Sequence, residues 1–380
     1  MNLKIKEKIG NRDGFSLIEL LVSLAIMSLI GSTVIYNVFS FNSSKILLNQ
    51  AVKLESVLRS VQLQAVSEEE GTAWGIKIFS QVGSDDKYET FSGSSYDSGT
   101  VDDVFYLPSE LQFSNPTGGN AIEIVFTQGT GATTAEYIDI DIMTTGEGHR
   151  LYVNSDGAVT LIKGGKGLVG YYKLDEASGT TAIDWSGFEN NGTITGATVN
   201  QIGQVDKAYT LATTDYVTVS DPADGSLDFG TGDFTLMAWF KTSDTTSEQN
   251  IITKGGTSNA VAGYRLSVND LGSGGDIWVG LSDGTTLSSC ALGSGYTDGL
   301  WHQVAMVTTR SSNVITVYVD GDLLDTCSTT STTGSASSAN NFTISYTDST
   351  EDFVGSLDDV RVFNRALSSS EVNEIYEETR

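Results

Sequence analysis

The chain has 380 residues, which exceeds what one hydrophobic core usually serves, so two folded domains are expected in addition to any membrane segment. Its 48 acidic residues outnumber 21 lysines and arginines, and the formal charge is -27. A surface that binds phosphates needs the opposite sign, so nucleic acid is excluded as a partner class. The acidity favours solubility outside the cell, with calcium affinity as a second interpretation.

Residues 1–14 form a short leader with four basic side chains, and a long apolar stretch follows. Glu19 is the only charged residue from 15 to 39, a length that suits a membrane-spanning helix. The basic leader predicts that residues 1–14 stay in the cytoplasm while the rest is exported. A carboxylate in hydrocarbon costs about 2.5–3.5 kcal/mol, so Glu19 needs a partner. An ordinary signal peptide is cut after its apolar core, whereas the candidate cut site here precedes it.

The run from Gly14 to Leu21 resembles the start of type IV pilins and pseudopilins. In that family a membrane peptidase cuts after the glycine matching Gly14 and methylates the new N-terminal residue, here Phe15. The acid matching Glu19 pairs with the freed amino group of a neighbouring subunit during assembly. The alternative is a plain signal anchor in which Glu19 is incidental.

That resemblance implies where the protein resides and what it contacts. The chain would enter the inner or cytoplasmic membrane through residues 15–39, and the prepilin peptidase would process it. It would then join other pilin or pseudopilin subunits in a filament at the cell surface or in the periplasm. The later domains would lie outside the cytoplasm.

The helix is predicted to continue beyond the membrane, so that residues 15–70 form one long element. No proline interrupts residues 15–68, and the acidic run before Gly71 predicts the end. Acids are poorly placed at a helix C-terminus, so an end one turn earlier is the alternative. This outer half is expected to pack on a small sheet, with a coiled-coil partner as the alternative. Its apolar positions recur in steps of four and three and trace one stripe: Leu47, Ala51, Leu54, Leu58, Val61 and Ala65.

Residues 71–163 change to the alternating pattern of β-strands with frequent turns. Asp156-Gly157 is a hairpin signal. The Ser/Gly/Asp-rich stretches 83–101 and 128–134 are expected to be surface loops. Strands are predicted at 74–79, 121–126, 137–142, 151–153 and 158–162.

The order of these elements resembles the globular part of the H-type minor pseudopilins of type II secretion. Trp74-Gly75, Leu107-Pro108 and the closing hairpin carry the resemblance. It implies an α+β pilin domain, in which the long N-terminal helix packs on a small antiparallel β-sheet.

Residues 164–167, Gly-Gly-Lys-Gly, are the expected linker, and residues 168–380 show strand signals at short intervals with little helix. That pattern is typical of a β-sandwich. The segment resembles the laminin-G-like or concanavalin A-like family, which implies an all-β jelly roll that can host many activities. Six stretches carry this resemblance, in the family's order: 172–179, 184–192, 233–239, 300–305, 318–321 and 355–364.

The sequence shows no catalytic arrangement, and we expect that the chain is not an enzyme. A retaining glycosidase of this architecture needs two carboxylates about 5–5.5 Å apart across a cleft. The nearest alternating acids, Asp139 and Asp141, lie in the other domain. His302 follows Trp301 in a strand motif of the family and is expected to be structural.

Calcium as a structural ion is implied by the jelly-roll resemblance. Asp184 and Asn190 lie in the first loop motif, Asp358 and Asp359 lie in the last strand, and these motifs are expected to meet. Calcium takes six to eight oxygen ligands, which such loops supply. The alternative is that these are solvated polar residues in an acidic chain.

A glycan would need exposed aromatic rings, and the candidates are Trp185, Trp278 and Tyr296. For each, a place in the core or on a strand face is the alternative. An extracytoplasmic address permits a disulfide between Cys290 and Cys327, with two buried thiols as the alternative.

The sequence thus predicts a minor pilin or pseudopilin that carries a lectin-like sandwich. A domain as large as residues 168–380 would crowd a helical lattice, so a tip or sparsely occupied position is favoured. Two roles stay open. In one the sandwich is an adhesin for glycan or protein, and in the other it is a spacer on a subunit that primes or caps a secretion pseudopilus.

Overall fold

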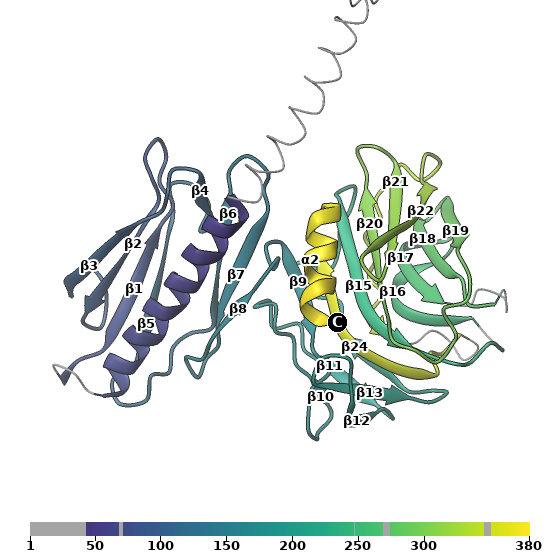
Figure 1. Ribbon diagram of the computed structural model, residues 1–380, viewed down its shortest axis with the longest axis horizontal. Coiled ribbons are helices and arrows are strands. Elements are labelled where there is room, and N and C mark those ends of the chain that lie inside the picture. Colours follow the sequence, from purple (N-terminus) through teal and green to yellow (C-terminus); the bar gives the residue numbers. More distant parts are fainter. Residues whose placement is uncertain (1–42, 68–70, 247, 269–273, 346–350) are drawn as a thin grey trace, which may run out of the picture.

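The computed structural model describes residues 43–67, 71–246, 248–268, 274–345 and 351–380. The predicted leader and membrane segment, with Gly14, Phe15 and Glu19, lie outside these ranges. Within the described ranges, no helix is both long and apolar enough to cross a bilayer. The chain folds into an α+β unit and a β-sandwich that lie side by side, joined near the strand β8 (Figure 1).

The α+β unit begins with a helix at residues 43–66, drawn in purple in Figure 1. The six residues of the predicted stripe are each at most 1% exposed, as the periodicity predicts. They pack on apolar residues of two small antiparallel sheets rather than on a second helix. The helix ends one turn before residue 70, which spares its C-terminus the unfavourable acids.

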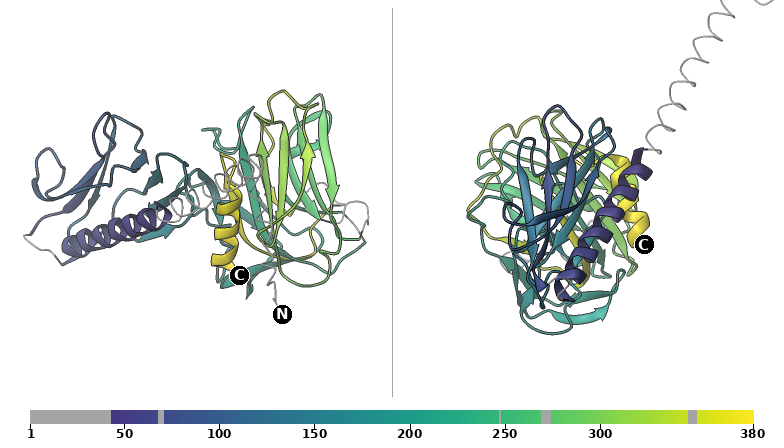
Figure 2. Two further views of the ribbon diagram at one scale, coloured as in Figure 1. Left: turned by 45° about the horizontal axis from the view of Figure 1, so that its top comes forward. Right: turned by 90° about the vertical axis from the view of Figure 1, so that its left-hand side faces the viewer.

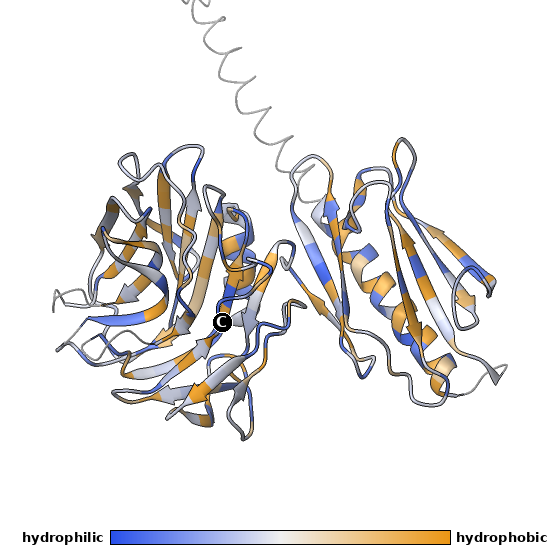
Figure 3. Cartoon of the chain, turned by 180° about the vertical axis from the view of Figure 1, so that it is seen from behind, coloured by the Kyte–Doolittle hydropathy of each residue, from blue (hydrophilic) through white to orange (hydrophobic). Residues whose placement is uncertain are grey.

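Two four-stranded sheets lie against this helix, in the strand orders β3-β2-β1-β5 and β4-β6-β7-β8. Apolar residues of these strands pack with the helix in one core, and hydrophobic and hydrophilic segments alternate along the strands in Figure 3. The strands are β1 (Trp74–Phe79), β2 (Lys87–Ser92), β3 (Thr100–Tyr106), β4 (Leu111–Asn115), β5 (Ala121–Phe126), β6 (Glu136–Ile142), β7 (Gly148–Val153) and β8 (Val159–Ile162).

One sequence expectation fails in this unit. The stretch 83–101 was expected to be a surface loop, but it contains the whole of β2, whose residues Tyr88 and Phe91 are buried. The strand was not predicted because its polar residues interrupt the apolar alternation. One of them, Glu89, is buried and accepts hydrogen bonds from Lys87 and Tyr96. The expected loop at 128–134 contains no strand or helix.

The second unit is an all-β sandwich, as the sequence predicts. Two antiparallel sheets face each other, with strand orders β10-β11-β14-β23-β16-β17-β18-β19 and β12-β13-β24-β15-β20-β21-β22 (Figure 2). β9 pairs with β24 at the side of the second sheet. One continuous apolar core fills the space between the sheets.

Strand bounds in the sandwich are β9 (Leu168–Tyr172), β10 (Thr181–Ala182), β11 (Gly192–Thr195), β12 (Thr198–Ile202), β13 (Lys207–Leu211), β14 (Tyr216–Val219), β15 (Phe234–Lys241), β16 (Gln249–Ser258), β17 (Val261–Val268), β18 (Ile277–Ser282), β19 (Leu287–Leu292), β20 (His302–Thr309), β21 (Val314–Val319), β22 (Asp322–Ser328), β23 (Phe342–Ile344) and β24 (Gly355–Phe363).

A C-terminal helix, α2 (Ser369–Thr379), covers the outer face of the sheet that contains β15, β20 and β24. Ser368 and Glu371 form a capping box at its start, a signal in the sequence that could have predicted this helix. Val372 and Ile375 pack with apolar residues of the sandwich and of the α+β unit in one shared cluster.

The predicted linker 164–167 is a packed joint. Gly164 and Gly165 are buried, and the backbone carbonyl of Lys166 accepts a hydrogen bond from Arg365 Nε at 2.8 Å. The ammonium group of Lys166 lies 2.6 Å from a carboxylate oxygen of Asp141 on β6. The segment is therefore held by residues of both units, by Arg365 of the sandwich and by Asp141 of the α+β unit.

Candidate functional site

The joint between the units centres on a buried arginine. Arg150 on β7 is 2% exposed and forms two hydrogen bonds with Asp139 on β6, Nε to Oδ1 at 2.6 Å and Nη2 to Oδ2 at 2.7 Å. Its Nη1 donates to the backbone carbonyls of Leu168 and Ser186, both in the sandwich. The acids that alternate on β6 are thus ion-pair partners within the fold, Asp139 of Arg150 and Asp141 of Lys166.

Aromatic stacking reinforces this contact. The guanidinium carbon of Arg150 lies 4.0 Å from the ring centre of Tyr137, and Tyr137 stacks on Phe188 of the sandwich with ring centres 5.6 Å apart. The loop of residues 184–190, which holds two of the four predicted calcium ligands, is therefore one part of the sandwich that contacts the α+β unit.

Asp184, the first predicted calcium ligand, has its oxygens satisfied by the backbone. Its Oδ1 accepts hydrogen bonds from the N–H groups of Tyr171 and Ser186, both at 2.9 Å, and its Oδ2 accepts one from Asn190 at 3.0 Å. The side-chain amide of Asn190 in turn donates to the Ser226 hydroxyl at 2.9 Å. These contacts shape the loop, and burial raises the pKa of Asp184.

Asp358 and Asp359, the two acids of the last strand, have different hydrogen-bond partners. Asp359 accepts hydrogen bonds from Arg361 at both oxygens. Asp358 Oδ2 accepts the N–H groups of Gln204 and Val205, both at 2.8 Å, while its Oδ1 is buried with no hydrogen-bond partner. Burial raises the pKa of Asp358 to about 8.

Asp184, Asp358 and Asp359 each accept hydrogen bonds from the protein, and calcium binding by the four predicted ligands stays a prediction. The motifs meet as expected, since β9 pairs with β24 and Tyr172 bridges to Asp184. Among the residues that the structure describes, however, no three acidic, histidine or cysteine side chains converge as a metal site would require. Of these four residues, only Asp358 has a buried side-chain oxygen without a hydrogen-bond partner.

The three predicted ligand-binding aromatics lie in different places. Trp185 is partly buried at the joint, with Lys173 Nζ 4.4 Å from its ring centre. Trp278 on β18 is 8% exposed, and the Arg265 guanidinium lies 4.0 Å above it. Tyr296 packs against the core. In both tryptophans a cation of the protein occupies one ring face.

Cys290 and Cys327 form a disulfide. The bond joins β19, the last strand of one sheet, to β22, the last strand of the other, across 37 residues of sequence. It therefore closes the sandwich at one open side.

His302, expected to be structural, lies at the start of β20 between two acids. Its Nδ1 lies 2.8 Å from Asp320 Oδ2, and its Nε2 lies 3.3 Å from Asp298 Oδ1. The hydrogen bond with Asp320 raises the pKa of His302. These contacts tie the loop before β20 to the turn after β21.

The sandwich has a pocket lined by several hydroxyl side chains, which the sequence did not indicate. It has a volume of about 400 Å³ and lies where β15 ends and β24 begins, beside Thr210 of β13. Thr210, Ser243 and Ser356 bring hydroxyl groups to it, and Lys241 is exposed at its edge. Hydroxyl and ammonium groups can bind a polar ligand without an aromatic platform, and no short motif marks their convergence.

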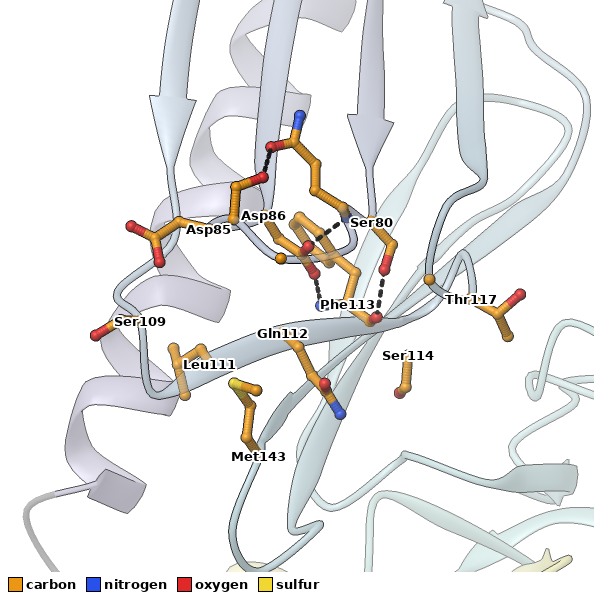
Figure 4. A pocket seen from close by; sticks show the side chains of 14 residues that line it. Ser80, Asp85, Asp86, Ser109, Leu111, Gln112, Phe113, Ser114, Thr117 and Met143 are labelled. Atoms are coloured by element: carbon orange, nitrogen blue, oxygen red, sulfur yellow. Dashed lines mark hydrogen bonds between the residues drawn. The ribbon is translucent and has the colours of Figure 1, made fainter.

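A second pocket, of about 530 Å³, lies on the α+β unit between the β1–β2 loop and β4 (Figure 4). Asp86 holds its walls together, because its carboxylate accepts the N–H groups of Gln81 and Phe113, each at 2.6 Å. Ser80 also donates to the Phe113 carbonyl at 3.1 Å. Met143 contributes an exposed apolar side chain.

Comparison with solved structures returns partial likenesses of low identity. The binding domain of Paraclostridial Mosquitocidal Protein 1 is 18% identical, with a TM-score of 0.46 over 56% of this chain and 52% of that chain. The botulinum neurotoxin serotype D ligand binding domain in complex with N-acetylneuraminic acid is 16% identical, with a TM-score of 0.45 over 56% and 51%. This chain thus spans about half the length of those structures. No curated protein matches the sequence.

Two family models match the sequence itself. The prokaryotic N-terminal methylation motif matches residues 9–35, and the concanavalin A-like lectin/glucanases superfamily matches residues 211–373. The structure extends the second of these upstream, since β9 at Leu168–Tyr172 pairs with β24. The chain therefore combines the N-terminal methylation motif of prepilins with a C-terminal concanavalin A-like jelly-roll domain.

Proposed function

We propose that the protein is a minor pilin or pseudopilin subunit that displays its sandwich on a filament for adhesion to a glycan or a protein, and that it has no catalytic role. The observation that carries this proposal is the methylation motif at residues 9–35 on the same chain as a concanavalin A-like domain. The helix at 43–66 packed on two small sheets supports assignment of residues 43–163 to a pilin domain.

The packed joint supports a display role. Arg150, the buried Gly164 and Gly165, and the shared apolar cluster fix the sandwich to the α+β unit. The pocket beside Lys241 is the candidate ligand site, because its hydroxyl groups offer the donors and acceptors that sugars or polar peptides require.

Filament membership can be tested at the N-terminus. The mature chain should begin at Phe15, carry a methyl group and be found in sheared filaments. Gly14→Val should prevent cleavage, whereas Glu19→Ala should leave cleavage intact and reduce incorporation. A mature chain that begins elsewhere, or normal incorporation of the Glu19→Ala protein beside the wild type, would contradict the proposal.

Adhesion needs its own test, because the alternative is a priming or capping pseudopilin with the sandwich as a spacer. The purified full chain in detergent should bind a subset of a glycan array or extracellular matrix proteins. Lys241→Ala with Ser243→Ala should abolish that binding, whereas the exposed Leu323→Ala on β22 serves as a matched control. Absence of any binding would favour the spacer.

A further inference from the structure

The strand β3 is an exposed edge on the α+β unit, at the end away from the sandwich (Figure 1). β2 pairs with one side of β3, and no strand of the described chain pairs with its other side. Of its seven residues only Phe105 is partly buried. Proteins usually shorten or cover such edges, because unpaired backbone groups recruit another strand.

A bulge gathers the apolar side chains of β3 on one face. The register with β2 shifts between Val101 and Val104, so that Val101, Val104 and Tyr106 stand opposite alternate residues of β2. Tyr88, which lies between those residues of β2, packs in the core beneath the helix. The three side chains therefore share the outer face, where they are 41%, 44% and 62% exposed.

Two acids lie within the bulge. Asp102 and Asp103 are exposed, and no ion pair engages either of them within the described residues. The nearby Lys87 is already paired with Glu89. A second copy of the chain would bring its own two acids to this edge and a net charge of -27, so a like copy is repelled. A cationic segment meets both acids favourably.

The opposite flank of the α+β unit is occupied. Tyr152 on β7 and Ile162 at the end of β8 pack with sandwich residues, and Figure 1 shows the sandwich beside β7 and β8. The flank formed by β3 lies away from the sandwich (Figure 1), so a neighbouring subunit can approach it from the side.

We propose that β3 docks an extended, cationic segment of a different filament subunit, whose backbone lies along the edge and whose apolar side chains cover Val101, Val104 and Tyr106. This inference rests on the proposed filament role. Strand addition points alternate side chains to opposite faces, so the partner strand should carry apolar residues on one face and lysine or arginine near Asp102 and Asp103.

Photocrosslinking in cells that assemble the filament tests the contact with the full chain. A benzophenone amino acid at position 104 should crosslink to another protein with a methylation motif, through a segment rich in lysine or arginine. Position 323 on β22 is the matched control, because Leu323 is also an exposed apolar residue on an edge strand. It should crosslink far less to that protein.

Charge reversal then tests the chemistry. Asp102→Lys with Asp103→Lys should reduce the crosslink at position 104 by about tenfold, and Asp102→Asn with Asp103→Asn by less, since exposed charge pairs are individually weak. The melting temperature should not change, because both side chains are exposed. Crosslinking to a second copy, or no crosslink above the control while the chain is still incorporated, would overturn the docking proposal alone. Absence of the wild-type chain from filaments would overturn the filament role as well.

Discussion

His149 on β7 accepts a hydrogen bond at Nδ1 from the backbone N–H of Gly164, at 3.0 Å, inside the joint. The ring is 4% exposed, and burial lowers its pKa to about 4 despite the nearby acids Glu371 and Glu378. The neutral imidazole is therefore a structural part of the connection between the two units, since a protonated Nδ1 could not accept this bond.

Acid should weaken the protein through His149. The unfolded chain takes up the proton at a pKa of about 6.5 and the folded chain only at about 4, so stability is lost as pH falls through that window. The loss attributable to this residue should reach about 3 kcal/mol at pH 4. His149→Gln keeps an acceptor and cannot titrate, so denaturant melts should show a smaller loss between pH 7 and 4. Equal acid sensitivity would exclude this role.

Removal of the Arg150 guanidinium should destabilise the joint. Arg150→Met leaves Asp139 as a buried charge without its partner, which costs about 3–5 kcal/mol. Adding Asp139→Asn should recover part of the loss because the uncompensated charge disappears. Denaturant unfolding of the full chain in detergent measures the stability of both variants. The control is Arg59→Met, which removes the exposed ion pair with Glu55. A loss below about 1 kcal/mol for Arg150→Met would contradict the buried contact.

His302 should stabilise the sandwich more at low than at high pH. Its folded pKa is raised, so its contribution is complete below about 6.5 and is lost as pH rises through the folded value. The acids are partly exposed, so the contribution should be about 0.5–1 kcal/mol. The melting temperatures of wild type and His302→Gln should therefore differ more at pH 6 than at pH 9. A pH-independent difference would mean that only packing is lost.

Loss of the disulfide should destabilise the sandwich by about 3–4 kcal/mol, as the chain-entropy model gives for a closed loop of 37 residues. The double variant Cys290→Ala, Cys327→Ala is the test, because alanine avoids placing a hydroxyl at the buried Cys327. Reductant should lower the stability of the wild type and leave the double variant unchanged. Two titratable thiols in the native, unreduced protein would contradict the bond.

Calcium should change the melting temperature little. An ion raises the melting temperature only if it binds the folded state. The oxygens of Asp184 already accept hydrogen bonds from backbone N–H groups and those of Asp359 accept them from Arg361, so they are poorly placed to bind an ion. A calcium titration of the chelator-treated protein measures the effect. A concentration-dependent rise that Asp358→Asn removes would instead establish an ion at the buried Asp358 oxygen that lacks a hydrogen-bond partner.

Much of the fold could be predicted because it follows local periodicity. The stripe from Leu47 to Ala65 and the alternation in β21 indicate directly which face is buried, whereas β15 is buried on both faces. The strand β2 was not predicted, because its buried Glu89 interrupts the apolar pattern and finds its partners only in the folded unit. The helix α2 was not predicted, because its capping box lies in a segment whose pattern is otherwise all-β.

The site was less predictable because its contacts are not local. The donors that satisfy Asp358 are backbone groups of Gln204 and Val205, more than 150 positions away in sequence, and backbone donors carry no residue signature. The same holds for Arg150, whose acceptors in the sandwich are carbonyls. Resemblance located the strand and the loop correctly, while the partners of each carboxylate depended on tertiary packing.

The short joint at residues 164–167 also determines how the molecule responds to tension. A flexible tether would straighten under a small pull and absorb it by losing entropy. Here Lys166 is held by Asp141 on one unit and Arg365 on the other, so a pull on the sandwich must first break side-chain contacts. Tension applied to the sandwich is therefore transmitted to β6 and β7 and on to the helix that packs against them.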